Sequence, residues 1–590
     1  MNLSIAYCYD DDLRRAANAE GRNYWYRYVE EILDRLGATG TAIGRGDLDD
    51  AARLAGFSAL IVGDLEAAQM PAGAPEVLRA WVEAGGLLIG FMTAGLDDVF
   101  GCRAITRVRR PGDDFCPSAS FALTEHPACA GVHSTLHPEQ RLIAIGDSLA
   151  LKPDEGTEVV ARLFNLWGAS IGAAITARRL GAGTAFYFGI HVPQTFWAIQ
   201  QGRPIDADYD GDGYLRSSDA RVIGTNDPEV AYTDEILFLL ANMLAVRPHP
   251  TLSPIPPLDG RPADLLLFWG GDDEHMEDVQ LPASDWMRSR GLPYHINIMP
   301  IRGHFAVSRE DFAHIRANGH EPSLHFNFID DFRHPGGFTA EDVASQARAY
   351  REAFGCDPVC VVTHFARWVG WHEPAEWMAA RGIKADNSHF HRGSPPLNPV
   401  NSFGFSFGTA YPFWFYSDWR DGNRRLDFLE EPITAYEMGY VQSNENPSFE
   451  GLRTILDLAA RTHLTLNTFY HPVYIARFPQ CRNAIDELLR YLEARRYRAV
   501  HMGNDEVWRW WEARSRGRIT DARADEDGVS CTASCDYPGG FTLRVPCGER
   551  APKAATCDGA PAALLAREEF GQHWAEVALP AGEHQLELRF

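Results

Sequence analysis

Short apolar runs alternate with amphipathic stretches over the first 246 residues. Apolar runs at residues 3–8, 59–62 and 87–91 predict strands, and residues 24–36 and 74–84 carry helical spacing. Strands that are buried on both faces show continuous apolar runs, as these do. Alternation of such strands with helices predicts a doubly wound α/β domain built on a parallel sheet.

The remaining sequence divides into three parts. Residues 247–262 are proline-dense, which excludes a helix or a central strand and indicates a linker. Residues 263–516 repeat strand and helix patterns, which predicts a central (β/α) barrel. Residues 517–590 lack helical periodicity and alternate apolar with polar positions between turns, which predicts a small C-terminal β-sandwich. A chain of 590 residues is also too long to fold around a single hydrophobic core, so several domains are expected.

Charge and apolar content limit the partners. The net charge is −25, from 55 Lys and Arg against 80 Asp and Glu, which argues against nucleic acid or an anionic membrane. No run of 18 apolar residues exists, so no membrane span is expected. Composition leaves the oligomeric state undetermined.

The chain start and the cysteines bear on the compartment. The first residues lack a basic region followed by a long apolar one, which predicts a cytoplasmic protein. A periplasmic or extracellular protein whose leader has been removed would begin in the same way. The 11 cysteines contain no CxxC pair, so we expect mostly buried thiols, with a disulfide in the C-terminal region as the alternative.

Three polar motifs follow predicted barrel strands. Asp272 and Asp273 end an apolar run, His320 and His325 flank a second strand, and His471 ends a third. Each alone has an ordinary explanation, as a helix cap or a core histidine. Ligands bind at the carboxyl ends of barrel strands, however, so the three motifs together predict one active site.

The order of these motifs resembles the polysaccharide deacetylase family, with its NodB-type barrel, over residues 265–516. The resemblance implies that Asp272 is the catalytic base and His471 the general acid. It also implies that Asp273, His320 and His325 bind Zn²⁺ or another divalent transition metal. Residues 363–367 stand where the family has a further motif, so His364, Arg367 and the nearby Trp371 are candidates for substrate contact.

The N-terminal segment resembles glutamine-amidotransferase-like, flavodoxin-like domains. In active amidotransferases the catalytic cysteine lies on a tight turn after a strand. Residues 90–95 occupy that place here and contain no cysteine, which predicts an accessory role for the segment. The order of domains is similar to that of deacetylases acting on galactosamine-containing exopolysaccharides. The resemblance therefore implies an N-acetylated carbohydrate as substrate.

An acidic loop within the first segment predicts a structural Ca²⁺ site. Acids occupy loop positions 1, 3, 5 and 12, and a glycine stands at position 6 for the sharp turn. The final acid is Asp, as in dockerin-type loops, which this loop resembles. The predicted calcium-binding residues are Asp208, Asp210, Asp212, Tyr214 and Asp219.

The expected function is removal of N-acetyl groups from an amino-sugar glycan by metal-activated water. Two alternatives remain open: hydrolysis of another C–N amide or imide bond on the same barrel, and an inactive carbohydrate-binding protein. A glycosidase with paired carboxylates is disfavoured by the histidine pattern. His364, His389 and His391 form a rival metal set, since His389 and His391 share a face of a strand.

Overall fold

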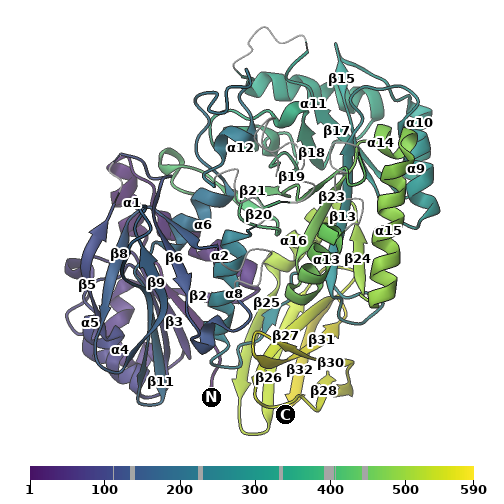
Figure 1. The fold of residues 1–590 in the computed structure, drawn as a ribbon. Coiled ribbons are helices and arrows are strands. Elements are labelled where there is room, and N and C mark those ends of the chain that lie inside the picture. Colours follow the sequence, from purple (N-terminus) through teal and green to yellow (C-terminus); the bar gives the residue numbers. More distant parts are fainter. Residues whose placement is uncertain are drawn as a thin grey trace.

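The computed structural model describes residues 1–109, 112–132, 140–223, 230–330, 337–390, 404–405, 407–440 and 450–590. The chain is a multi-domain α/β protein. Figure 1 shows the N-terminal part at the left, the second strand–helix part at the upper right, and the C-terminal strands beneath it. No helix in the described ranges is both long enough and apolar enough to span a membrane. All eleven cysteines are described and all are free thiols, so the alternative of a C-terminal disulfide is not realised.

The N-terminal part is built on one mixed sheet. The predicted apolar runs form parallel strands, but the sheet continues into antiparallel strands and is not the wholly parallel sheet that was expected. Its parallel strands, in the order β2-β1-β3-β4-β11, continue into the antiparallel strands β10-β9-β6-β7, while β8 pairs with β10 and β5 pairs with β8. The strands are β1 Ile5–Cys8, β2 Gly40–Ile43, β3 Ala59–Gly63, β4 Leu87–Phe91, β5 Cys102–Val108, β6 Pro117–Leu123, β7 Leu142–Ile145, β8 Ser148–Pro153, β9 Thr157–Phe164, β10 Ser170–Leu180 and β11 Gly183–Phe188. The longer helices are α1 Asp11–Ala19, α2 Val29–Leu36, α4 Ala74–Glu83, α6 Val192–Gln200 and α8 Tyr232–Leu244.

The second part is a curled sheet with the order β20-β21-β19-β18-β17-β14-β13-β23-β22, and β24 also pairs with β13. All its pairs are parallel except β20 with β21. The strands are β13 Leu265–Asp272, β14 His295–Ile298, β17 Glu321–Phe326, β18 Cys360–Thr363, β19 Ala385–Asp386, β20 Phe413–Tyr416, β21 Arg425–Glu430, β22 Ala435–Tyr436, β23 Thr465–Phe469 and β24 Ala499–Met502. Its helices include α9 Gln280–Ser289, α10 Arg309–Ala317, α11 Ala340–Phe354, α12 Glu373–Ala379, α13 Glu450–Thr462, α14 Pro472–Arg477, α15 Pro479–Arg495 and α16 Asn504–Arg516.

The C-terminal strands form two antiparallel sheets, β12-β27-β31-β30 and β25-β26-β32-β28-β29. One strand, β12, comes from the proline-dense segment, so that segment is partly ordered by strand pairing. The strands are β12 Thr251–Leu252, β25 Arg518–Ala524, β26 Gly528–Cys535, β27 Phe541–Gly548, β28 Ala554–Cys557, β29 Ala560–Pro561, β30 Leu564–Glu569, β31 Gln572–Leu579 and β32 Gly582–Arg589. The first residues of the chain contact the C-terminal strands, because the Leu3 amide donates a hydrogen bond to the Ala522 carbonyl at 2.8 Å.

A buried ion network joins these sheets to the curled sheet. His463 Nε2 lies 2.8 Å from Glu569 Oε1 and 3.1 Å from Glu576 Oε1, and the Arg544 guanidinium contacts both carboxylates. Burial disfavours charge on His463, but the two glutamates outweigh it and raise the pKa of His463 above its ordinary value. The same contacts hold the pKa of Glu569 below its ordinary value despite burial.

This network predicts a pH-dependent contribution to stability. Because folding raises the pKa of His463, the protonated imidazole contributes its full stabilisation below about pH 6.5. That contribution to the free energy of unfolding is lost as pH rises through the pKa of the folded state. His463→Asn, chosen because Asn tolerates the left-handed φ of 57° at this position, is expected to cost about 3 kcal/mol near pH 6 and less near pH 9. Urea unfolding at both pH values measures this cost, and His573→Asn, in the strand β31 that carries Glu576, is the control. An equal cost at both pH values would contradict the assignment.

Candidate active site

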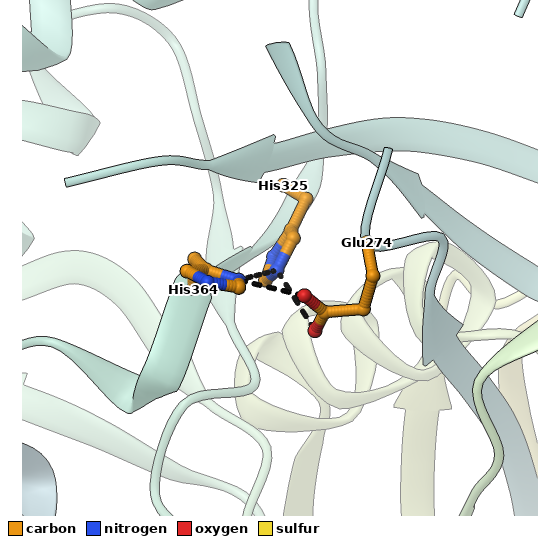
Figure 2. A group of neighbouring side chains, drawn as sticks. All are labelled: Glu274, His325 and His364. Carbon is orange, nitrogen blue, oxygen red and sulfur yellow. Dashed lines mark hydrogen bonds and ion pairs between the residues drawn. The ribbon is translucent and has the colours of Figure 1, made fainter. Parts of the chain in front are cut away.

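Polar side chains converge where four parallel strands end. Asp272 ends β13 and Glu274 follows it, His325 lies in β17, His364 follows β18, and His471 follows β23. Parallel strands present their carboxyl ends at one edge of the sheet, which explains why residues 197 positions apart in sequence meet. Figure 2 shows Glu274, His325 and His364 directed toward one another.

Glu274 lies at the centre of this cluster. Its Oε2 lies 3.0 Å from His364 Nδ1, and its Oε1 lies 3.1 Å from His471 Nε2. His325 Nε2 lies 3.3 Å from His364 Nδ1 and 3.6 Å from Asp272 Oδ2. The Val362 carbonyl accepts a hydrogen bond from His325 Nδ1 at 3.2 Å, so Nε2 is the ring atom that faces the carboxylates. The site is therefore a compact group of three imidazoles and two carboxylates.

The backbone around the cluster is adapted to bring these groups together. A Cβ on Gly271 would stand 1.6 Å from the Tyr470 carbonyl, so only glycine allows β13 to approach the His471 segment. Glu274 and Glu437 adopt left-handed φ values of 52° and 45°, and Phe365, beside His364, has a φ of 59°. Such conformations are costly for non-glycine residues and concentrate at functional sites.

The charges of the two carboxyl groups differ because their surroundings differ. Burial disfavours ionisation of Glu274, but hydrogen bonds from the three imidazoles outweigh it and hold the pKa of Glu274 well below its usual range. Burial raises the pKa of Asp272, and the nearby His325 and His471 offset only part of that effect. Glu274 is thus the more acidic of the two groups, and Asp272 is the more basic carboxylate.

His471 is held by a second carboxylate on its far side. Its Nδ1 contacts Glu437 Oε1 closely, while its Nε2 faces Glu274. Burial disfavours the charged imidazolium, but Glu437 and Glu274 outweigh burial and raise the pKa of His471 well above its usual range. An imidazolium oriented in this way can deliver a proton from Nε2 into the site.

The cluster has the donors that a divalent metal requires. One ligand atom each from Glu274, His325 and His364 lies within 4.8 Å of the other two. Within the described residues, Asp272 Oδ1 is buried and has no hydrogen-bond partner. Two imidazoles and a carboxylate suit Zn²⁺, and an unpaired buried carboxylate oxygen is costly unless a proton, water or cation meets it. These residues therefore fit a metal ion.

A cavity of about 200 Å³ opens beside the cluster. Asp272, Glu274 and His471 line one side. An apolar wall with aromatic rings lines the other and consists of Val362, Phe390, Ile433, Tyr436 and Phe469. The polar side chains of Asn387 and Ser388 also reach the cavity, which thus offers an apolar wall and convergent polar groups, the usual composition of a ligand site.

Two of the residues predicted to bind metal do not reach the cluster. His320 precedes β17 and contacts Ser284 Oγ at 2.8 Å and the Leu292 carbonyl at 3.1 Å, away from the carboxyl end of that strand. Asp273 accepts hydrogen bonds from the Met299 and His275 amides, both at 2.9 Å, so it braces the loop after β13. Burial raises the pKa of Asp273 to about 6. Glu274 and His364, instead of Asp273 and His320, offer ligand atoms close to that of His325.

Two of the predicted substrate contacts are buried elsewhere. Arg367 is 1% exposed and donates to the Leu215 and Phe328 carbonyls at 2.9 and 3.2 Å. Trp371 is 4% exposed and stacks on Trp197 with ring centroids 5.4 Å apart. Both side chains join the N-terminal part to the part built on the curled sheet. His364, the third predicted contact, lies in the cluster.

The acidic loop at residues 208–219 lies next to the site. Asp208 Oδ1 accepts from the Gly211 amide at 2.7 Å, and Asp219 Oδ1 accepts from the Tyr209 amide at 2.7 Å. The Tyr214 ring packs against Phe365 with centroids 5.9 Å apart, and Arg216 of this loop lines the cavity. Asp210 and Asp212 bond within the loop, to Ser218 at 2.7 Å and Arg216 at 2.5 Å. The loop thus faces the cavity, and calcium binding stays a prediction.

The rival histidine set is not assembled in the described structure. His389 is 1% exposed, lies 3.0 Å from Glu430 Oε2 and is surrounded by the rings of Trp368, Phe407 and Phe415. His391 lies outside the described residues. The residues that the sequence reasoning missed are Glu274 and Glu437. The only available signal was that Glu274 directly follows two acids at a strand end.

Comparisons with known proteins do not assign the chain to a family. No protein-family model and no curated protein matches it. A β-galactosidase from Rahnella sp. R3 has 18% identity and a TM-score of 0.25, covering 32% of this chain and 29% of its own length. A putative GMP synthase component from Thermoplasma acidophilum has 10% identity and a TM-score of 0.24, covering 42% of this chain and 94% of its own. A putative ThuA-like protein from Bacteroides uniformis has 11% identity and a TM-score of 0.22, covering 32% and 82%.

Proposed function

We propose that the chain is a metal-dependent hydrolase that removes N-acetyl groups from an amino-sugar glycan. The observation that carries the proposal is the convergence of Asp272, Glu274, His325, His364 and His471 beside one cavity. Amide hydrolysis needs an activated water, stabilisation of an oxyanion and a proton for the departing amine. This group of side chains contains a candidate for each requirement.

Each residue takes a role from its surroundings. A divalent ion held by Glu274, His325 and His364 would polarise the acetamide carbonyl and help activate water. Asp272, the more basic carboxylate, accepts a proton from the attacking water. His471, kept protonated by Glu437, donates from Nε2 to the sugar amine as the C–N bond breaks. The products are acetate and the free amino sugar.

The cavity walls suit a sugar. The rings of Tyr436 and Phe469 stack on each other with centroids 5.6 Å apart and line the apolar side, against which a sugar face can pack. Asn387 and Ser388 also line the cavity beside this wall and add polar groups that the hydroxyls of a sugar can contact.

Acetate release tests the function directly. Purified protein is incubated with N-acetylated galactosamine and glucosamine oligosaccharides, with and without chelator, and acetate is measured enzymatically. We expect release that the chelator abolishes and added zinc restores. Binding of the oligosaccharides without release would favour the inactive carbohydrate-binding alternative. Hydrolysis of cyclic imides instead of acetamides would favour the other C–N hydrolase.

The pairing of His471 with Glu437 predicts a change in pH dependence. Glu437→Gln removes the carboxylate that raises the pKa of His471, so the imidazole loses its proton at lower pH. The alkaline limb of kcat/KM should move to lower pH by about one unit. Initial rates of acetate release across pH 6–10 measure the limb, and in His471→Asn the limb should be absent. An unchanged limb in Glu437→Gln would show that Glu437 does not set this pKa.

A further inference from the structure

A second group of metal-type side chains lies at the junction between the curled-sheet part and the N-terminal part. His372, which precedes α12, directs Nε2 toward Asp418 Oδ1 at 3.7 Å and Asp421 Oδ2 at 3.9 Å. One ligand atom from each of the three lies within 4.8 Å of the other two. We propose that His372, Asp418 and Asp421 bind a divalent transition metal, with zinc as the best fit.

The state of His372 is the independent observation that supports a ligand. Its side chain is 3% exposed, and its Nδ1 has no hydrogen-bond partner within the described structure. An imidazole so deeply buried normally has its ring nitrogens satisfied, because each unpaired polar atom is costly. Nε2 faces the two aspartates at 3.7 and 3.9 Å, too far for hydrogen bonds, and a cation between these three atoms would fill that gap and place the ring proton on Nδ1, on the side of Glu376.

The nearby carboxylates are arranged for this role. Glu376 Oε2 lies 3.6 Å from His372 Nδ1, on the opposite side of the ring from the two aspartates. A metal-ligating histidine usually donates its other ring N–H to a carboxylate, which a small approach of Glu376 would provide. Asp418 is held in place because its Oδ1 accepts the Arg420 amide at 2.7 Å, while Asp421 is 47% exposed and leaves the site open to solvent.

The position of the site indicates a structural role. His372 follows Trp371, which stacks on Trp197 of α6. Two residues after Asp421 stands Asn423, whose Oδ1 accepts hydrogen bonds from the Tyr24 backbone amide at 3.0 Å and from the Asn18 side-chain amide at 2.7 Å. A metal joining His372 to Asp418 and Asp421 would therefore tie together two segments that both contact the N-terminal part. This inference does not depend on the proposed hydrolase activity.

Zinc binding to defined variants tests the inference. The full chain with His364→Ala, which disables the catalytic cluster, is titrated with zinc in excess calcium, so that the oxygen-only loop at 208–219 does not compete. We expect one zinc per chain to remain. Adding Asp421→Asn should weaken it at least about tenfold, and adding His372→Asn should abolish it. Asp427→Asn, an equally small change at an exposed acid nearby, should leave zinc binding unchanged.

Two results would overturn the proposal. The first is an absence of zinc in the His364→Ala chain, and the second is zinc binding that neither His372→Asn nor Asp421→Asn weakens. A measurement that needs no variant is anomalous diffraction at the zinc edge from soaked crystals of the unaltered chain. A peak beside His372 Nε2 supports the site, whereas a peak only at the catalytic cluster refutes it.

Discussion

His364→Ala is expected to lose the catalytic metal and at least about a thousandfold of kcat/KM, whereas His320→Ala is expected to keep both. The reason is geometric. His364 Nδ1 lies 3.0 Å from Glu274 Oε2 and 3.3 Å from His325 Nε2, in the middle of the cluster. His320 contacts Ser284 and the Leu292 carbonyl instead, so its loss should cost about 1–3 kcal/mol of stability and no metal.

The two histidine variants form a matched pair, since both remove one buried imidazole. Metal content after dialysis against buffered zinc, followed by acetate release, gives both readouts on the same samples. The family resemblance assigned His320 as a ligand, so it predicts the opposite outcome. Retention of metal in His364→Ala together with its loss in His320→Ala would establish that ligand set and reject the one proposed from the geometry.

Asp272→Asn is expected to lower kcat by about a thousandfold while the metal stays bound. Asp272 is the carboxylate whose pKa burial raises, and its Oδ1 has no partner in the described structure, so it is the oxygen available to accept a proton. The amide of Asn has nearly the same shape but cannot act as a base. Glu274→Gln, at a carboxylate that three imidazoles contact, should lose metal and activity together.

Metal content and single-turnover rates separate the two carboxylates. If Asp272→Asn loses as much metal as Glu274→Gln, then Asp272 is a ligand, and the base must be sought elsewhere. If both variants keep metal and activity, the cluster is not the reaction centre. In that case the cavity with its aromatic wall remains a candidate for carbohydrate binding without hydrolysis.

Local sequence predicted the strand ends of the site well. The apolar run before Asp272 has to form a buried strand, and a strand of a parallel sheet has to deliver its last residues to the carboxyl edge. The same reasoning placed His325 and His471 in one site, together with His320, whereas His364 came from the family resemblance and was given a substrate role. These predictions succeeded because they depend on the hydrophobic period and chain direction, both of which are local properties.

The direction in which each side chain points could not be predicted from the local sequence. His320 and His325 lie at opposite ends of β17, so only one can reach the cluster, and their spacing does not say which. Glu274 reaches the centre through a left-handed φ of 52°, a conformation that its own sequence does not favour. Arg367 and Trp371 had the residue types of substrate contacts, yet the N-terminal part covers both.

The sequence by itself determined the succession of strand–helix and all-strand segments and the strand ends that carry polar residues, because hydrophobic periodicity and turn residues act over a few positions. Only the tertiary structure decided that Glu274 takes the central place beside His325 and His364, and that Glu437 holds His471. Those contacts join residues 34 to 197 positions apart, and packing of the sheet and its loops, which no local pattern encodes, sets their distances.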